Sequence, residues 1–153
     1  MKLSIIIVPY KAKEKVEVTL DAVYASVVNF DYEVIVVDNL PSSGTEDLIG
    51  TKYLSKPQLA SKTMYIPNSE NVGFPKANNQ GLKISTGEYK LLLNPDTKVA
   101  PETLQMMMDF MKSRPDVGVS TCKMVKGDGS LDLACRRSFP DPWVSFFRLS
   151  GLS

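Results

Sequence analysis

The stretch "YKLLLNPDTKV", residues 89–99, decides the fold class of this sequence. Its first half is a continuous apolar run, which is typical of a strand buried on both faces of a parallel sheet. The run stops abruptly at Asn94-Pro95-Asp96-Thr97, where proline and polar residues favour a turn. Because this strand ends at a carboxylate, we expect polar side chains at the carboxyl edge of the sheet, which is where open α/β folds bind ligands.

Further apolar runs of the same kind occur along the chain, with helical patterns between them. This alternation predicts an α/β fold with a doubly wound, mostly parallel sheet. The predicted strands are residues 2–10 ("KLSIIIVPY"), 32–39 ("YEVIVVDN"), 89–96 and 117–122 ("VGVSTC"), with a weaker one at 62–68 ("KTMYIPN"). The predicted helices are residues 13–29, 73–86 and 100–114.

Composition limits the classes of function that the chain can have. The sequence has 153 residues, 43% hydrophobic and 23% charged, as expected of a soluble globular protein. A net charge of +1 gives no support for nucleic-acid binding. The absence of histidine removes the usual general base and the commonest metal ligand. With two cysteines and no apolar stretch of the ~18–20 residues that a membrane span needs, we expect a cytoplasmic protein without disulfides or transmembrane segments.

The composition of the sequence changes after Cys122, where short strand-like pieces, glycines and prolines replace the long apolar runs. We therefore expect an α/β domain over residues 1–122, followed by a separate region over 123–153. This region should begin with a hairpin around the Gly127-Asp128-Gly129 turn. Its last residues start an amphipathic pattern whose aromatic side chains would favour self-association through an uncovered face. These aromatic residues are Trp143, Phe146 and Phe147.

Polar residues follow several of the predicted strands at the same edge of the sheet. Asp38 ends the second strand, Asn94 and Asp96 end the strand at 89–96, and Pro9-Tyr10 ends the first. A carboxylate at this edge can hydrogen-bond a ribose or a base, or hold a hard divalent cation. The alternative is that both aspartates merely cap the helix or turn that follows them.

The glycine segment "NVGFPKANNQG", residues 71–81, is a weaker signal. Gly73 would let the backbone pass close to a ligand, and a helix N-terminus after it would favour a phosphate. The segment is neither the G-x-G-x-x-G fingerprint nor a P-loop. An ordinary glycine turn into a helix explains it equally well when it is taken alone.

Taken in order, these motifs resemble glycosyltransferase family 2, whose members have the GT-A fold. The resemblance rests on "SIIIVPY", "VIVVDN", "NVGFPKANNQG", "GEYKLLLNPDT", "PDVGV" and "DGSLDLACRRSFP", and it covers essentially the whole chain. The glycine segment and "LLNPDT" look like those of its rhamnosyltransferase-like branch. The resemblance implies a Rossmann-like, mostly parallel sheet sandwiched by helices, in a chain that ends before the acceptor-binding half.

The resemblance also implies roles for particular residues. Asn94-Pro95-Asp96 takes the place of the family's D-x-D motif. Asp96 would then bind Mg²⁺ or Mn²⁺ on the diphosphate of the donor, whereas Asn94 replaces the first aspartate and would contact ribose or a metal-bound water. Asp38 would hydrogen-bond the nucleobase, with Pro9 and Tyr10 as the wall of its pocket. The glycine segment would add to the donor site through Asn71, Gly73, Asn78 and Asn79.

The function that this implies is donor binding in an inverting glycosyltransferase. The donor would be a nucleoside-diphosphate sugar, with dTDP-rhamnose as the specific expectation. The acceptor would be a glycan or a lipid-linked acceptor for a cell-surface polymer, at the inner face of the membrane in a longer parent protein. The catalytic base is unknown, because no residue after Asp96 matches the family's catalytic aspartate.

The sequence was compared with three alternatives to this function. The first is a non-catalytic nucleotide-binding or interaction module of the same fold. The second, a phosphoacceptor signalling domain, needs an acidic pair after the first strand, which Pro9-Tyr10-Lys11 does not supply. The third, a dinucleotide-dependent oxidoreductase, lacks its glycine fingerprint after that strand.

Overall fold

The computed structural model describes residues 2–40, 44–135 and 141–151. The chain forms two compact units, Met1–Ser113 and Arg114–Ser153. The first unit contains the sheet and every predicted site residue. The fold that positions the site is therefore that of the first unit.

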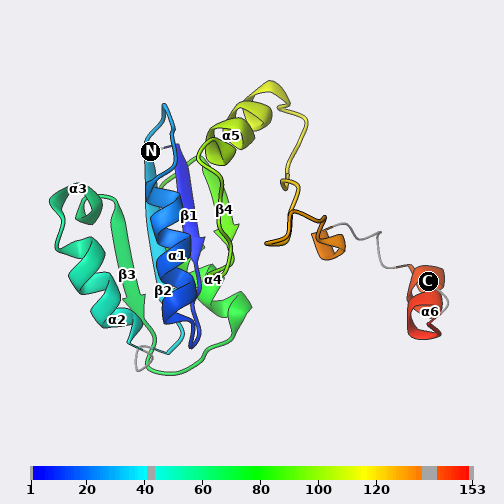
Figure 1. Cartoon of the computed structure of the whole chain (residues 1–153), viewed down its shortest axis with the longest axis horizontal. Coiled ribbons are helices and arrows are strands. Elements are labelled where there is room, and N and C mark those ends of the chain that lie inside the picture. Colours follow the sequence, from blue (N-terminus) through cyan, green and yellow to red (C-terminus); the bar gives the residue numbers. More distant parts are fainter. Residues whose placement is uncertain (1, 41–43, 136–140, 152–153) are drawn as a thin grey trace. The chain divides into compact units, whose positions relative to one another are not determined.

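The first unit is built on a four-stranded parallel sheet (Figure 1). The strands are β1 (Leu3–Ile7), β2 (Tyr32–Asp38), β3 (Thr63–Pro67) and β4 (Tyr89–Leu93), in the order β3-β2-β1-β4. All residues of β1 and β2 are buried, which explains why their sequences are continuous apolar runs rather than alternating ones. The predicted mostly parallel α/β sheet is confirmed.

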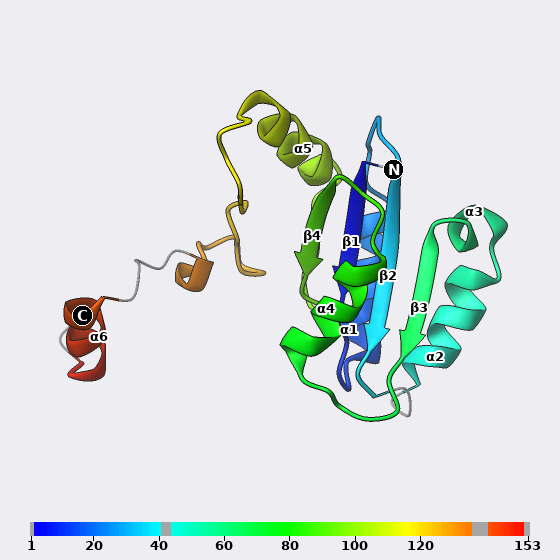
Figure 2. The same cartoon turned by 180° about the vertical axis from the view of Figure 1, so that it is seen from behind.

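Helices cover both faces of this sheet. The helix α1 (Lys13–Tyr24) lies on one face and α4 (Phe74–Ile84) on the other, as comparison of Figures 1 and 2 shows. The core on the α1 face also takes side chains from α5 (Thr103–Ser113). Between β2 and β3 the chain forms α2 (Thr45–Leu48), the π-helix η2 (Ile49–Leu54) and α3 (Pro57–Ala60). The helical patterns had not predicted these three elements.

The first helix is shorter than the sequence predicted. Its pattern favoured residues 13–29, but α1 ends at Tyr24. Beyond it, Val27 is 67% exposed, and its backbone N–H bonds the Pro101 carbonyl at 2.9 Å. The N–H of Asn29 likewise bonds the side chain of Gln105 at 2.9 Å. The chain leaves the helix here because these groups near α5 supply alternative backbone partners.

The predicted strand at residues 117–122 is wrong. These residues form no strand, and Val119 is 91% exposed. A β-branched run becomes a strand only where a neighbouring edge pairs with it and buries one of its faces. Gly118, in the middle of the run, adds no side chain to pack.

The second unit contains the expected turn in reduced form. A single antiparallel bridge joins Val125 to Leu131, and the N–H of Lys126 bonds the Ser130 carbonyl at 2.8 Å. Gly129 has a φ of 82°, which suits glycine in a turn. A short 3₁₀ helix (Leu133–Cys135) and α6 (Pro142–Leu149) follow. The aromatic residues expected on α6 are exposed, and self-association through them stays a prediction: Trp143, Phe146 and Phe147.

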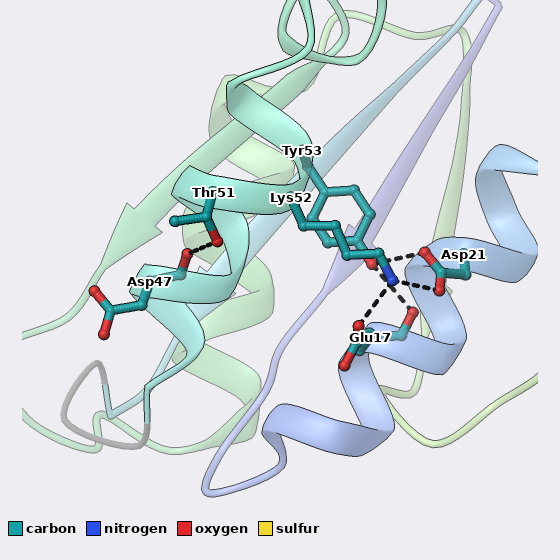
Figure 3. Close-up of polar contacts among 6 residues, drawn as sticks. All are labelled: Glu17, Asp21, Asp47, Thr51, Lys52 and Tyr53. Atoms are coloured by element: carbon teal, nitrogen blue, oxygen red, sulfur yellow. Dashed lines mark hydrogen bonds and ion pairs between the residues drawn. The ribbon is translucent and has the colours of Figure 1, made fainter.

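A polar cluster joins α1 to η2 (Figure 3). The Lys52 ammonium lies 2.8 Å from a Glu17 carboxylate oxygen and 2.6 Å from one of Asp21. The Tyr53 hydroxyl donates to the other Asp21 oxygen at 3.0 Å, while its ring is buried in the core. Burial and the Asp21 carboxylate raise the pKa of Tyr53, so its hydroxyl remains a donor. The single Lys52 ammonium contacts both carboxylates of the cluster, which indicates a structural role.

A buried carboxylate holds the sheet together at its amino edge. One oxygen of Glu33 accepts hydrogen bonds from the Ser4 hydroxyl at 2.7 Å, the Thr86 N–H at 2.7 Å and the Thr86 hydroxyl at 2.8 Å. The Ser4 hydroxyl in turn accepts the N–H of Gly87 at 2.8 Å. This network connects Thr86 and Gly87, which lead into β4, with the first residues of β1 and β2.

Candidate functional site

The strand order places a topological switch point between the carboxyl ends of β1 and β4. The sheet grows from β1 toward β2 on one side and toward β4 on the other, and open α/β sheets bind ligands at such a switch point. Pro9 and Tyr10 follow β1, and Asn94, Pro95 and Asp96 follow β4. The structure thus brings two of the predicted groups of site residues to adjacent strand ends.

The β1 side of this switch point combines one buried and one exposed residue. Pro9 is buried, and its carbonyl accepts the N–H of Asn39 at 3.0 Å, which fixes the exit of β1 against that of β2. Tyr10 is 45% exposed, and the Lys11 ammonium lies 5.5 Å from the centre of its ring. Lys11 has a φ of 50°, which is uncommon for a residue with a side chain. An exposed aromatic ring beside a cation suits a planar, negatively charged ligand.

Asp38 ends β2 and is fully buried. One carboxylate oxygen accepts the N–H of Leu40 at 3.0 Å, and the other accepts the Tyr65 hydroxyl at 2.9 Å. Tyr65 pairs with Val36 in the sheet register, so it shares a face with Asp38 and reaches it diagonally. Burial and the hydrogen bond to Asp38 raise the pKa of Tyr65. The carboxylate can accept further hydrogen bonds, but because it is fully buried, a base can reach it only when the surrounding side chains move.

We expect Tyr65→Phe to lower the free energy of unfolding by about 1–2 kcal/mol, because it leaves one buried oxygen of Asp38 without its donor. Urea denaturation followed by circular dichroism measures the change. Tyr24→Phe is the matched control, since its hydroxyl bonds Thr63 rather than a carboxylate. Equal losses in the two variants would contradict a special role for the bond to Asp38.

Side-chain amides join the ends of β2 and β3 to α4. The Asn68 amide donates to the Asn39 side chain at 3.0 Å and exchanges two hydrogen bonds of 2.9 Å with Gln80. Asn39 and Asn68 are both buried. Sequence reasoning missed this network, although an asparagine directly after a strand is the signal that could have drawn attention to Asn68.

The glycine segment supplies residues of different character. Gly73 has a φ of 85°, and its N–H bonds the Asn71 side chain at 2.9 Å, so the turn into α4 depends on glycine. Asn78 is buried, and its amide donates to the Phe74 carbonyl of the same helix at 2.9 Å. Asn71 and Asn79 are exposed. Asn78 therefore acts within its own helix, whereas the two exposed amides are open to a ligand.

The turn after β4 is fastened to α1. The N–H of Thr97 closes the turn on the Asn94 carbonyl at 3.2 Å, and the buried Thr19 hydroxyl donates to the Pro95 carbonyl at 2.8 Å. One oxygen of Asp96 lies 3.8 Å from the Lys15 ammonium. The side chains of this ion pair are 55% and 66% exposed, respectively. The carboxylate predicted to bind a metal thus faces a lysine that sequence reasoning had not singled out.

The residues at this turn offer a divalent cation an incomplete set of ligands. Asp96 supplies one carboxylate, and Asn94 supplies one amide oxygen, which are ligand types that Mg²⁺ and Mn²⁺ accept. Within residues 2–40, 44–135 and 141–151, no three acidic or cysteine side chains gather as a metal site. A cation would therefore need oxygen atoms from a bound ligand, as Mg²⁺ sites commonly do.

Two aspartates of the second unit form hydrogen bonds with residues near them in the sequence. Arg114 makes two hydrogen bonds to Asp116, of 3.0 and 2.9 Å. Asp128 accepts the N–H and the hydroxyl of Ser130 at 2.9 and 2.7 Å. These contacts stabilise local turns and do not prepare either carboxylate as a general base.

No helix in the described part of the chain is both long and apolar enough to cross a membrane.

The fold is of the Rossmann-like α/β class, with a parallel sheet covered by helices on both faces. The sequence profile of glycosyl transferase family 2 matches residues 4–148. The chain belongs to that family.

Similar proteins agree with this membership. The poly(ribitol-phosphate) beta-glucosyltransferase of Bacillus spizizenii is 28% identical over 143 residues, which are 92% of this chain and 22% of that protein. The mannosyltransferase PcManGT from Pyrobaculum calidifontis, solved with GDP-Man and Mn²⁺, has a TM-score of 0.71 at 26% identity, over 80% of this chain and 36% of that one. Residues 1–349 of S. aureus TarS, solved with UDP, give 0.64 at 26% identity, over 75% and 33%. The GT-A-like fold expected from the resemblance is confirmed, and the chain spans well under half the length of these relatives.

Proposed function

We propose that this chain is the donor-binding part of an inverting glycosyltransferase that uses a nucleoside-diphosphate sugar. The observation that carries the proposal is the switch point between β1 and β4, where Tyr10 follows one strand and Asn94 and Asp96 follow the other. Family membership supports the reaction class. Nucleotides named in the titles of similar structures, UDP and GDP-Man, support the class of ligand.

The finer assignments rest on the motifs. The glycine segment and "LLNPDT" favour rhamnose as the sugar, with dTDP-rhamnose as the donor. A cell-surface glycan or its lipid-linked precursor is the proposed acceptor, met at the cytoplasmic face of the membrane. Relatives named for teichuronic acid and amylovoran biosynthesis support a polysaccharide product.

Charge sets the roles of the residues in this proposal. Breaking the sugar–phosphate bond builds negative charge on the departing diphosphate, which a divalent cation would neutralise as a Lewis acid. Asp96 and the Asn94 amide oxygen would hold that cation together with the diphosphate. Tyr10 would stack on the base, and Asp38, as an acceptor of hydrogen bonds, would favour bases that carry a ring N–H: uracil, thymine or guanine.

The alternative is a module that binds the nucleotide without turnover. Asp116 is bonded to Arg114, and Asp128 is bonded to Ser130. These contacts favour the alternative, because neither carboxylate is arranged to take a proton from an acceptor hydroxyl. Both readings share the same donor site. Transfer of labelled sugar to an acceptor glycan would distinguish them.

We expect Tyr10→Ala to weaken the binding of dTDP and UDP roughly tenfold, because stacking of a base on an aromatic ring contributes about 1–3 kcal/mol. Calorimetric titration with each nucleotide, with Mn²⁺ and with chelator, measures the affinity. Binding of inorganic pyrophosphate should not change, since it has no base to stack.

Phe110→Ala is the matched control, because Phe110 is an exposed aromatic residue on α5 with 42% exposure. It should bind both nucleotides like the wild type. A folded wild-type chain that binds no nucleotide would contradict donor binding. Unchanged nucleotide affinity in Tyr10→Ala would contradict only the place given to the base.

A further inference from the structure

Lys15 and Asp96 form an ion pair between the elements that follow β1 and β4, at the switch point of the sheet. Lys15 belongs to α1, the helix that follows β1, and Asp96 belongs to the turn that follows β4. Their charged groups are 3.8 Å apart. This ion pair therefore bridges the two strand ends between which the strand order places a ligand.

The position of Lys15 is fixed by more than its own flexible side chain. Thr19 lies one turn further along α1, and so on the same face of the helix. Its buried hydroxyl bonds the Pro95 carbonyl at 2.8 Å, next to Asp96 in the chain. Thr19 thus holds this face of α1 against the turn, and Lys15 is presented to Asp96 by the helix itself.

Stability of the helix does not explain a lysine at this position. Lys15 lies in the first turn of α1, where a positive charge is unfavourable because it faces the positive end of the helix dipole. An exposed ion pair at 3.8 Å offsets little of this cost. The same weakness allows the two partners to separate easily when a ligand with stronger charges arrives.

We propose that Lys15 is a donor-binding residue that exchanges partners, which rests on the donor site proposed above. In the free chain its ammonium neutralises Asp96. When a nucleoside diphosphate binds, Lys15 turns to a diphosphate oxygen and leaves the Asp96 carboxylate to a divalent cation. The single lysine thereby gives the site affinity for the diphosphate without metal.

The test compares the full chain with Lys15→Gln and Asp96→Asn in calorimetric titrations. Each is titrated with UDP and dTDP in chelator, and with Mn²⁺ alone. In chelator we expect Lys15→Gln to lose roughly tenfold in nucleotide affinity, as for one hydrogen bond to a charged group. Asp96→Asn should bind nucleotide in chelator at least as tightly as the wild type, because its Lys15 is free. Mn²⁺ alone should bind neither the wild type nor Lys15→Gln tightly, because Asp96 and Asn94 supply only part of a ligand set.

Lys83→Gln is the matched control, because it removes the same charge from the last turn of α4. It should behave like the wild type in every titration, and Lys15→Arg should recover most of the metal-free affinity. The inference is overturned if Lys15→Gln binds nucleotide like the wild type in chelator, if Lys83→Gln loses as much, or if wild-type binding vanishes without metal. A wild-type chain that binds no nucleotide under any condition overturns the proposed donor site as well, which separates the two failures.

Discussion

Gly87→Ala should lower the free energy of unfolding by about 3 kcal/mol, the largest stability effect that we expect from a single added methyl group. A Cβ atom at residue 87 would lie 2.6 Å from the backbone nitrogen of Ser4 and 2.8 Å from the carbonyl carbon of Leu3. Both atoms belong to the backbone of β1, which is paired on both sides and cannot yield. Urea denaturation followed by circular dichroism measures the loss.

Gly50→Ala is the control for this substitution. Gly50 lies in η2, and a Cβ there would meet no atom within 4 Å. Because alanine favours helical backbone more than glycine does, we expect no loss of stability and a gain of up to about 1 kcal/mol. A Gly87→Ala variant as stable as the wild type would mean that the entry to β4 can move away from β1.

Glu33→Ala should cost about 3 kcal/mol of unfolding free energy, because it removes the charged acceptor that the buried Ser4 hydroxyl shares with both donors of the exposed Thr86. Glu33→Gln keeps an acceptor oxygen at the same place and should cost less. If the two variants lost the same stability, the network would not depend on the oxygen that the three donors share. The same denaturation experiment distinguishes them.

The charge of Glu33 also makes stability depend on pH. Burial tends to raise the pKa of this carboxyl, but the hydrogen bonds from Ser4 and Thr86 outweigh burial and hold the pKa below its usual value. Since the folded-state pKa is the lower one, the stabilisation is complete above about pH 4.5 and is lost as the pH falls through the folded-state value. The difference in unfolding free energy between the wild type and Glu33→Gln should therefore shrink below pH 4.5.

Much of the sheet could be predicted from the sequence because its central strands are buried on both faces. Burial of this kind requires a continuous apolar run, and β1 and β2 have one. The strand β4 was expected to be buried on both faces as well, but it is an edge strand whose residues before Leu93 alternate between half-buried and exposed. The run at residues 117–122 has the same local pattern but no partner edge, and local patterns do not report whether a partner exists. The helices between β2 and β3 escaped prediction because they include a π-helix, which the usual helical spacing does not describe.

The candidate site could likewise be predicted only in part. The residues at strand ends could be found because the end of each strand marks the edge of the sheet. Tyr65, Gln80 and Lys15 were missed, since each acts through a partner distant in sequence that only the packing of strands and helices brings near. Nothing in "KEKVEVTL" alone distinguishes Lys15 from an ordinary solvated lysine.

The strand order has a consequence for a chain that is still being synthesised. β1 is made first. β2 can pair with it on leaving the ribosome, and β3 can then pair with β2. Its other edge must wait for β4, which pairs with it from Leu3↔Tyr89 to Ile7↔Leu93. Until then the most apolar strand of the protein presents unpaired N–H and C=O groups, a template on which another chain can add. The arrival of β4 covers this edge and makes β4 itself the outer strand, where the exposed Lys90 discourages the addition of another chain.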